Sequence, residues 1–94
     1  MPVSSSARIK ANNPARLILR LCKHWGHKFP VSFDERQGDV QLSIGRCLMQ
    51  AQVGELEVRL ESGDAEQLQK LEEVVADHLQ RMAGAEALNI EWRR

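Results

Sequence analysis

Residues 3–10 alternate between apolar or small side chains and polar ones, which is the pattern of a β-strand with one buried face. The run that follows, NNPARLILRLCKHWGH, changes to a helical period. Asn12 or Asn13 is suited to cap this helix, Pro14 stands at or near its first position, and Gly26 is a natural end. The opening segment therefore predicts a strand followed by a helix.

A period of two residues returns between positions 31 and 61. After a short run, VSFD, three longer runs each place their apolar residues on one face: DVQLSI with Val40, Leu42 and Ile44; RCLMQAQV with Cys47, Met49, Ala51 and Val53; ELEVRLE with Leu56, Val58 and Leu60. The breaks between runs, RQGD, Gly45 and Gly54, are short enough for hairpins. We expect an antiparallel meander with one face open to solvent.

The clearest helical pattern lies in the run SGDAEQLQKLEEVVADHLQRMAG. Asp64 with Gln67 resembles a capping box, and Gly84 ends the pattern. Five apolar residues follow the helical period, Leu68, Leu71, Val75, Leu79 and Met82, and the acids Glu72, Glu73 and Asp77 are expected on the solvated face. The run LNIEW then predicts a last strand, followed by Arg93-Arg94 as a tail. The order β-α-β-β-β-β-α-β predicts an α+β two-layer sandwich, with two helices on one face of a mainly antiparallel sheet.

The size of the chain is consistent with one such unit. Its 94 residues, 43% of them apolar and 28% charged, suffice for a single domain over residues 1–94 with one core. No apolar run could span a bilayer, and the segment MPVSSSARIK lacks the apolar centre of a secretory signal. We therefore expect a cytoplasmic protein without a membrane partner, whose two cysteines are small buried thiols.

The net charge of zero hides an uneven distribution along the chain. Residues 1–33 contain six Lys and Arg residues and no acid, whereas residues 34–94 contain seven Lys and Arg residues and all thirteen acids. A basic segment of this kind can mark an anionic partner. So small a domain cannot hold its parts far apart relative to a Debye length of about 8–10 Å, so we favour mutual neutralisation on one surface.

The run LCKHWGHKFP concentrates rare side chains at the end of the first predicted helix. At about 100° per residue, Cys22 and Trp25 join the apolar arc, which makes Cys22 a core residue rather than a reactive thiol. Because Cys22 and His24 lie about 160° apart, they do not form a local chelate. The remaining side chains form a basic, histidine-bearing terminus: Arg20, Lys23, His24, His27 and Lys28.

Three interpretations of this terminus stay open. Cations in a last helical turn favour the negative end of the helix dipole, which is a purely structural role. The same five side chains are candidates for binding an anionic small molecule or a protein partner. In the third interpretation, His24 and His27 bind a transition metal together with His78, which approaches them only if both helices cover the same face of the sheet.

Motifs for enzymatic chemistry are absent from the sequence. It contains no G-x-S-x-G, no phosphate-binding glycine loop, no H-E-x-x-H and no C-x-x-C. We therefore predict no catalytic residues and no cofactor. A small hydrolase or isomerase of unrecognised type stays an open alternative, and it would need a concave pocket with a perturbed histidine. Nucleic acid is not expected as a partner either, because exposed aromatic side chains for base stacking are not evident.

Three segments, ARLILRLCKHWGHKFPV, GRCLMQAQ and LEEVVADHLQRMAGAEALNIEW, resemble the bacterial family called domain of unknown function 2218. The resemblance runs from about Ser6 to Trp92, and its most specific parts surround His24 and His27 and the pair His78-Leu79. The family has no established activity, so the resemblance implies no catalytic residues. Its members also occur attached to, or near, siderophore-interacting flavin reductases, which implies an association with iron or siderophore handling.

Overall fold

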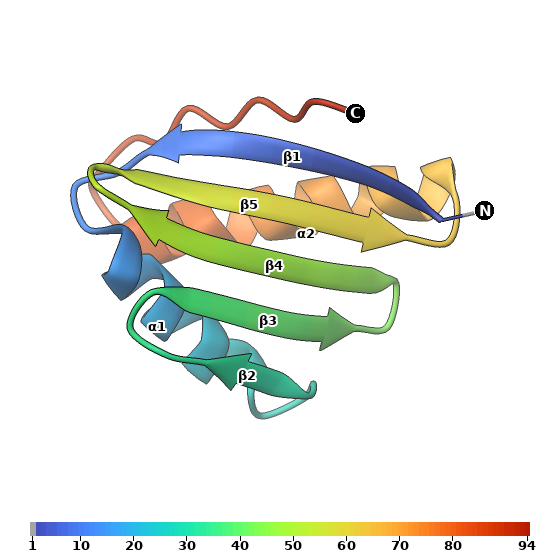
Figure 1. Cartoon of the computed structure of the whole chain (residues 1–94), viewed down its shortest axis with the longest axis horizontal. Helices are drawn as coiled ribbons and strands as arrows, with labels where there is room; N and C mark the ends of the chain where they lie inside the picture. The colour runs from blue at the N-terminus through green and yellow to red at the C-terminus, as the bar shows by residue number, and fades with distance from the viewer. Residues whose placement is uncertain (1) are drawn as a thin grey trace.

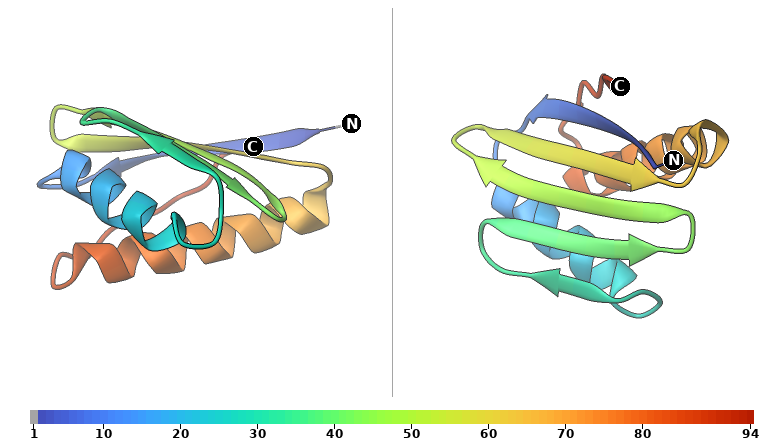
Figure 2. Two further views of the ribbon diagram at one scale, coloured as in Figure 1. Left: turned by 90° about the horizontal axis from the view of Figure 1, so that it is seen from below. Right: turned by 45° about the vertical axis from the view of Figure 1, so that its right-hand side comes forward.

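Five strands form one antiparallel sheet, and two helices cover the same face of it (Figure 1, Figure 2). The computed structural model describes residues 2–94. Its elements are β1 (Val3–Lys10), α1 (Pro14–Trp25), β2 (Val31–Phe33), β3 (Gln37–Leu42), β4 (Gly45–Gln52), β5 (Glu55–Ser62) and α2 (Ala65–Ala83). The predicted α+β fold, with two helices on an antiparallel sheet, is confirmed.

The strands follow the order β1-β5-β4-β3-β2 across the sheet. Strands β2 to β5 form the expected meander, whereas β1 pairs with β5, with Val3 opposite Ser62 and Lys10 opposite Glu55. The chain must therefore pass from one edge of the sheet to the other between β1 and β2. Helix α1 makes this crossing on the covered face (Figure 2).

Alternation along the strands separates core residues from those of the open face. In β5, Val58 and Leu60 are buried, whereas Arg59 between them is exposed. The buried side receives the apolar faces of both helices, so one core results; its buried apolar residues are Ala7, Ile9, Ala11, Leu17, Ile18, Leu21, Cys22, Trp25, Val40, Cys47, Met49, Leu56, Val58, Leu60, Leu68, Leu71, Val75 and Leu79. Val53 departs from the predicted alternation, because it lies in the turn after β4 and is fully exposed.

Helix α1 begins and ends where its sequence predicts. The Asn13 side chain accepts a hydrogen bond from the Arg16 amide at 3.2 Å, which satisfies one free N–H group of the first turn. Pro14 occupies the start of the helix, where its missing N–H group removes no hydrogen bond. The helix ends at Trp25, so the residues after Gly26 do not continue its basic stripe.

Gly38 of β3 lies where α1 approaches the sheet closely. A Cβ atom at this position would lie 2.9 Å from the Cys22 sulfur and 3.0 Å from Cγ2 of Ile18, so a side chain here would force these buried side chains of α1 to shift. The prediction of a break at RQGD was therefore wrong for residues 37–39, which belong to β3. The turn lies earlier, at Asp34, whose carboxylate accepts hydrogen bonds from the amides of Arg36 and Gln37.

Helix α2 has the cap that its sequence predicts, since the Asp64 carboxylate accepts a hydrogen bond from the Gln67 amide at 2.8 Å. Gly84, with a φ of 66°, ends the helix in a conformation that favours glycine. The buried side of α2 packs on β5, β1 and β4, next to α1. Among residues 2–94, neither helix combines the length and the apolar composition that a bilayer-spanning helix requires.

Residues 85–94 do not form the predicted last strand. They make a single antiparallel bridge, in which Ser6 and Arg93 exchange two backbone hydrogen bonds of 2.8 Å. Leu88, Ile90 and Trp92 are partly buried and pack against the core, as their alternation suggests. The segment therefore covers the edge of the core without extending the sheet.

Glu72 and Arg94 form an ion pair that corrects two further predictions. Glu72 was expected on the solvated face of α2, yet only 8% of the residue is exposed. Arg94 was expected in a tail, yet its Nη2 and Nε donate to the two oxygens of Glu72 at 2.9 and 3.3 Å. The paired N–H donors satisfy both oxygens of the buried carboxylate and fix the end of the segment against α2.

Candidate functional site

Five basic side chains lie on the second half of α1 or in the turn after it, and we call them the basic cluster: Arg20, Lys23, His24, His27 and Lys28. All five are exposed to solvent. None of them forms an ion pair with a carboxylate of residues 2–94. Arg20 is oriented by one contact, in which its Nη1 donates to the Met82 carbonyl of α2 at 2.9 Å. The cluster therefore presents its charge to solvent without an ion-paired carboxylate among residues 2–94.

Ion pairing does not cancel the uneven charge of the sequence. Of the six Lys and Arg residues in positions 1–33, only Arg8 pairs with an acid of the described chain, Glu57 at 3.2 Å. The remaining ion pairs join residues of the second part to one another: Arg46 with Asp39, Arg59 with Glu61, Arg81 with Asp77 and Arg94 with Glu72. Direct ion pairing of the basic first third with an acid is therefore seen for Arg8 alone among the described residues, and neutralisation over a Debye length stays a prediction.

His78 of α2 lies against the end of α1. Its ring centroid is 5.1 Å from that of Trp25 and 5.5 Å from that of His24. The two helices run antiparallel where they meet. Arg20 contacts Met82, and His24, one turn later on α1, contacts His78, one turn earlier on α2. The predicted approach of His78 to His24 is confirmed, and it depends on both helices covering one face of the sheet.

His27 follows the end of α1, so it is not part of the helix that carries His24. Residues 26–28 form a turn, in which the Lys28 amide donates to the Trp25 carbonyl at 3.0 Å. Within residues 2–94, no group of three or more His, Cys, Asp or Glu side chains is arranged to hold a metal ion. The structure thus brings together two of the three predicted metal ligands, and metal binding by His24, His27 and His78 stays a prediction.

The other unusual side chains of the opening motif belong to the core. Cys22 is fully buried and Trp25 is 4% exposed, as the helical wheel predicts. Burial raises the pKa of the Cys22 thiol to about 11, and burial also raises the pKa of Cys47. A thiol with so high a pKa is a poor nucleophile near neutral pH, so neither cysteine joins the candidate site.

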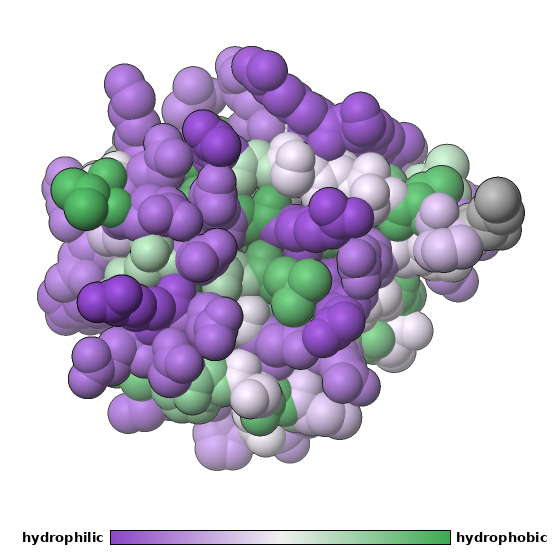
Figure 3. Space-filling model, in the orientation of Figure 1, coloured by the Kyte–Doolittle hydropathy of each residue, from purple (hydrophilic) through white to green (hydrophobic). Residues whose placement is uncertain are grey.

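A second feature, which the sequence did not indicate, is a hollow of about 600 Å³ on the open face of the sheet. It is lined by residues of all five strands, including Arg8, Ser32, Asp39, Leu48 and Arg59. Figure 3 shows this face as mainly hydrophilic with apolar residues near its centre. The sequence did show alternate polar residues in each strand, which predict an open face. Only the order of the strands in the sheet shows which of these residues line one hollow.

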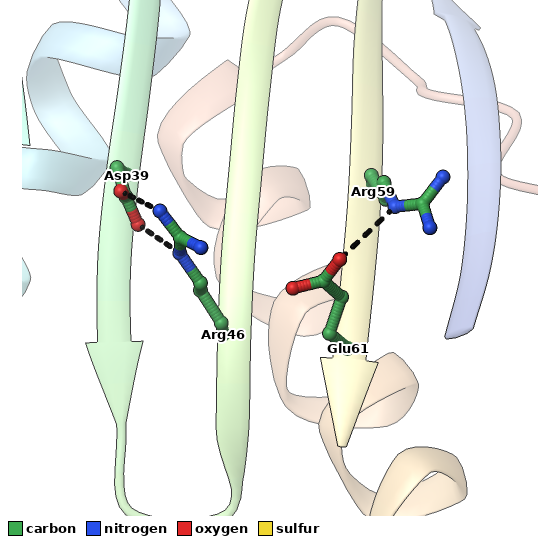
Figure 4. Close-up of polar contacts among 4 residues, drawn as sticks. All are labelled: Asp39, Arg46, Arg59 and Glu61. Atoms are coloured by element: carbon green, nitrogen blue, oxygen red, sulfur yellow. Dashed lines mark hydrogen bonds and ion pairs between the residues drawn. The ribbon is translucent and has the colours of Figure 1, made fainter. Parts of the chain in front are cut away.

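The charged groups of this open face are paired with one another (Figure 4). Arg46 of β4 donates to both oxygens of Asp39 on β3, and Nε of Arg59 lies 3.3 Å from the Glu61 carboxylate on β5. Hydrogen bonding from Arg46 lowers the pKa of Asp39, which keeps that carboxylate ionised. Arg8, Arg46 and Arg59 of this face therefore each have a carboxylate partner, unlike the cations of the basic cluster.

The chain matches, over residues 6–93, the model of a family described as an uncharacterised protein conserved in bacteria (DUF2218), so the resemblance of the sequence is confirmed. It is also similar to a solved structure, the NMR structure of PA4090 from Pseudomonas aeruginosa, with a TM-score of 0.80 and 39% sequence identity. That similarity covers 96% of this chain and 94% of the other. No curated protein matches the chain at a significant level.

Proposed function

The chain belongs to the DUF2218 family of uncharacterised bacterial proteins, and we propose that it is a non-catalytic module that binds an anionic ligand or protein partner through the basic cluster. The carrying observation is that Arg20, Lys23 and Lys28 are exposed and have no carboxylate partner among residues 2–94. An anion that meets these groups displaces only water and counter-ions. It does not have to break an existing ion pair first.

The arrangement of Arg20 supports this proposal. One N–H group of its guanidinium is held by the Met82 carbonyl, while the side chain remains exposed. The fixed bond limits the conformations of the long side chain, so less entropy is lost when an anion binds the remaining N–H groups. His24 and His27 are exposed as well and offer further N–H donors for an anionic oxygen.

Ferric siderophores are one ligand class to test, because many carry negative charge and the family resemblance implies an association with iron handling. Other anionic ligands could bind the same cations, so the proposed specificity is for the negative charge of the ligand. We also propose a cytoplasmic setting, because both cysteines are free, buried thiols rather than a disulfide. A reducing compartment keeps such thiols in that state.

Charge reversal tests the proposal. We expect the wild-type protein, at low NaCl, to be retained on heparin, a polyanion, and to elute as NaCl screens the cluster. The variant Arg20→Glu, Lys28→Glu should elute at a much lower salt concentration. Because the net charge of the chain is zero, retention of the wild type would report a local surface rather than the overall charge.

The matched control is Arg36→Glu, Lys70→Glu, which changes the net charge equally at two exposed positions outside the cluster. It should elute close to the wild type. Equal losses in both double variants, or wild-type retention that does not depend on NaCl, would contradict the proposal.

A further inference from the structure

We propose that His24 and His78 form a two-histidine site for a transition-metal ion, with Cu²⁺ bound more tightly than Ni²⁺ or Zn²⁺. This inference goes beyond anion binding, and it replaces the three-histidine set of the sequence with the two rings that the structure brings together. Their centroids lie 5.5 Å apart with an angle of 44° between the ring planes. The preference for Cu²⁺ follows from the general order of affinities of imidazole ligands for divalent metals.

The separation of the two rings fits ligation of one ion. A metal–nitrogen bond of about 2.0–2.1 Å places the metal about 3.2 Å from an imidazole centroid. Two rings bound at angles between about 90° and 180° then have centroids about 4.5 to 6.4 Å apart. The 5.5 Å between His24 and His78 lies inside this interval without any movement of the helices.

His78 is already oriented as a metal ligand would be. Its Nδ1 lies 2.7 Å from the Val74 carbonyl oxygen, which can only accept a hydrogen bond, so Nδ1 carries the proton. The neutral ring therefore keeps its lone pair on Nε2. A hydrogen bond from the second ring nitrogen to a backbone carbonyl commonly fixes histidines that bind metals. Trp25, 5.1 Å from the same ring, packs against it and limits its rotation.

His24 supplies the second ligand from the facing helix. It is exposed, so its ring can adjust by rotation about its own side-chain bonds. His27 lies in the turn after Gly26 and is not needed in this arrangement. Two protein ligands leave open coordination positions, which water or an anion would occupy.

Because basic residues surround the site, its affinity for a metal ion should depend on the salt concentration. Arg20, Lys23 and Lys28 repel a divalent cation, and this repulsion weakens with distance and in a medium of high dielectric constant. Salt screens this repulsion, so the affinity for the metal should rise with the concentration of a non-coordinating salt such as sodium perchlorate. The affinity of the basic cluster for an anion should instead fall as the salt concentration rises.

Copper binding can be measured directly on the tag-free protein in a non-coordinating buffer. Bound Cu²⁺ quenches nearby tryptophan fluorescence, and Trp92→Phe leaves Trp25, which contacts His78, as the reporter. We expect His24→Gln and His78→Gln each to weaken copper binding by at least about tenfold. The matched control His27→Gln should bind as the wild type does. Circular dichroism checks that each variant is folded.

Electron paramagnetic resonance of the wild-type copper complex gives a second readout that needs no variant, and two coordinated imidazole nitrogens are expected. An equal loss of affinity in His27→Gln would overturn the two-histidine assignment, as would a copper spectrum without imidazole nitrogens. Failure of this inference is distinct from failure of the proposed function, because heparin retention is measured with EDTA present and copper binding with no polyanion.

Discussion

Cys22 and Cys47 lie fully buried in the core between α1 and the sheet. Burial raises the pKa of Cys22 from the ordinary value of 9.0 to about 11, so at about pH 8 its thiolate is about 100-fold scarcer than in the unfolded chain. We expect both thiols of the native protein to react with Ellman's reagent at least about 100-fold more slowly than in guanidinium chloride.

The measurement is a comparison of the two absorbance traces, followed by mass spectrometry of the labelled peptides. A control trace with free cysteine shows that the reagent is active in both solutions. Rapid labelling of Cys22 in the native protein would contradict the prediction, because it would require the end of α1 to open.

Single residues also show what a local pattern can and cannot predict. The helical wheel placed Cys22 and Trp25 in the core, because amphipathic spacing is a property of the helix itself. Gly38 was interpreted as part of a break, since only the approach of α1 explains why a strand residue there must lack a side chain. Glu72 was assigned to solvent, since its burial with Arg94 depends on a segment that returns from the end of the chain.

At the scale of elements, tertiary contacts rather than a sheet ladder position the final segment. The side chain of Gln80 on α2 donates to the Glu86 carbonyl at 2.8 Å and accepts from the Leu88 amide at 2.9 Å. These contacts hold the first part of the segment against α2, and the bridge between Arg93 and Ser6 of β1 holds its end. The alternation of apolar residues was correctly read as one partly buried face, but the same pattern suits a strand and an extended covering segment alike.

The Glu72–Arg94 ion pair should anchor this segment. Arg94→Ala leaves a carboxylate of low exposure without its two N–H donors, so we expect a lower midpoint of denaturation. Glu72→Gln should be milder, because a neutral amide is buried at a smaller desolvation penalty than a charge. In the Glu72→Gln background, Arg94→Ala should therefore lower the midpoint by less than it does in the wild type.

Urea denaturation of the four proteins measures this coupling, and hydrogen exchange at the Ser6 amide, which bonds to Arg93, reports release of the segment. Arg93→Ala is the matched control: it removes an equal charge from the neighbouring position, whose bridge to β1 uses backbone atoms alone. A larger effect of Arg93→Ala than of Arg94→Ala would refute the anchoring role.

At the scale of the whole molecule, the charges divide between two surfaces. The three arginines Arg8, Arg46 and Arg59 of the open sheet face pair with carboxylates, two of these pairs being drawn in Figure 4. The end of α1 carries cations that form no ion pair among the described residues. The sequence revealed the excess of basic residues near the N-terminus but not their lack of partners, because pairing depends on which strands and helices become neighbours. For the same reason, the sequence could predict the approach of His78 to His24 only on the assumption that both helices cover the same face of the sheet.

Anion binding at the basic cluster should also change the stability of the whole molecule. A ligand that binds only the folded state, at about 100 times its Kd, adds about 2.7 kcal/mol to the free energy of unfolding. For a domain near this size, such a gain raises Tm by roughly 10 to 20 °C. We expect saturating pyrophosphate to raise the Tm of the wild-type protein at low NaCl, with a rise that shrinks as NaCl increases. The Tm of Arg20→Glu, Lys28→Glu should not respond, and an equal rise in this variant would show that pyrophosphate binds elsewhere.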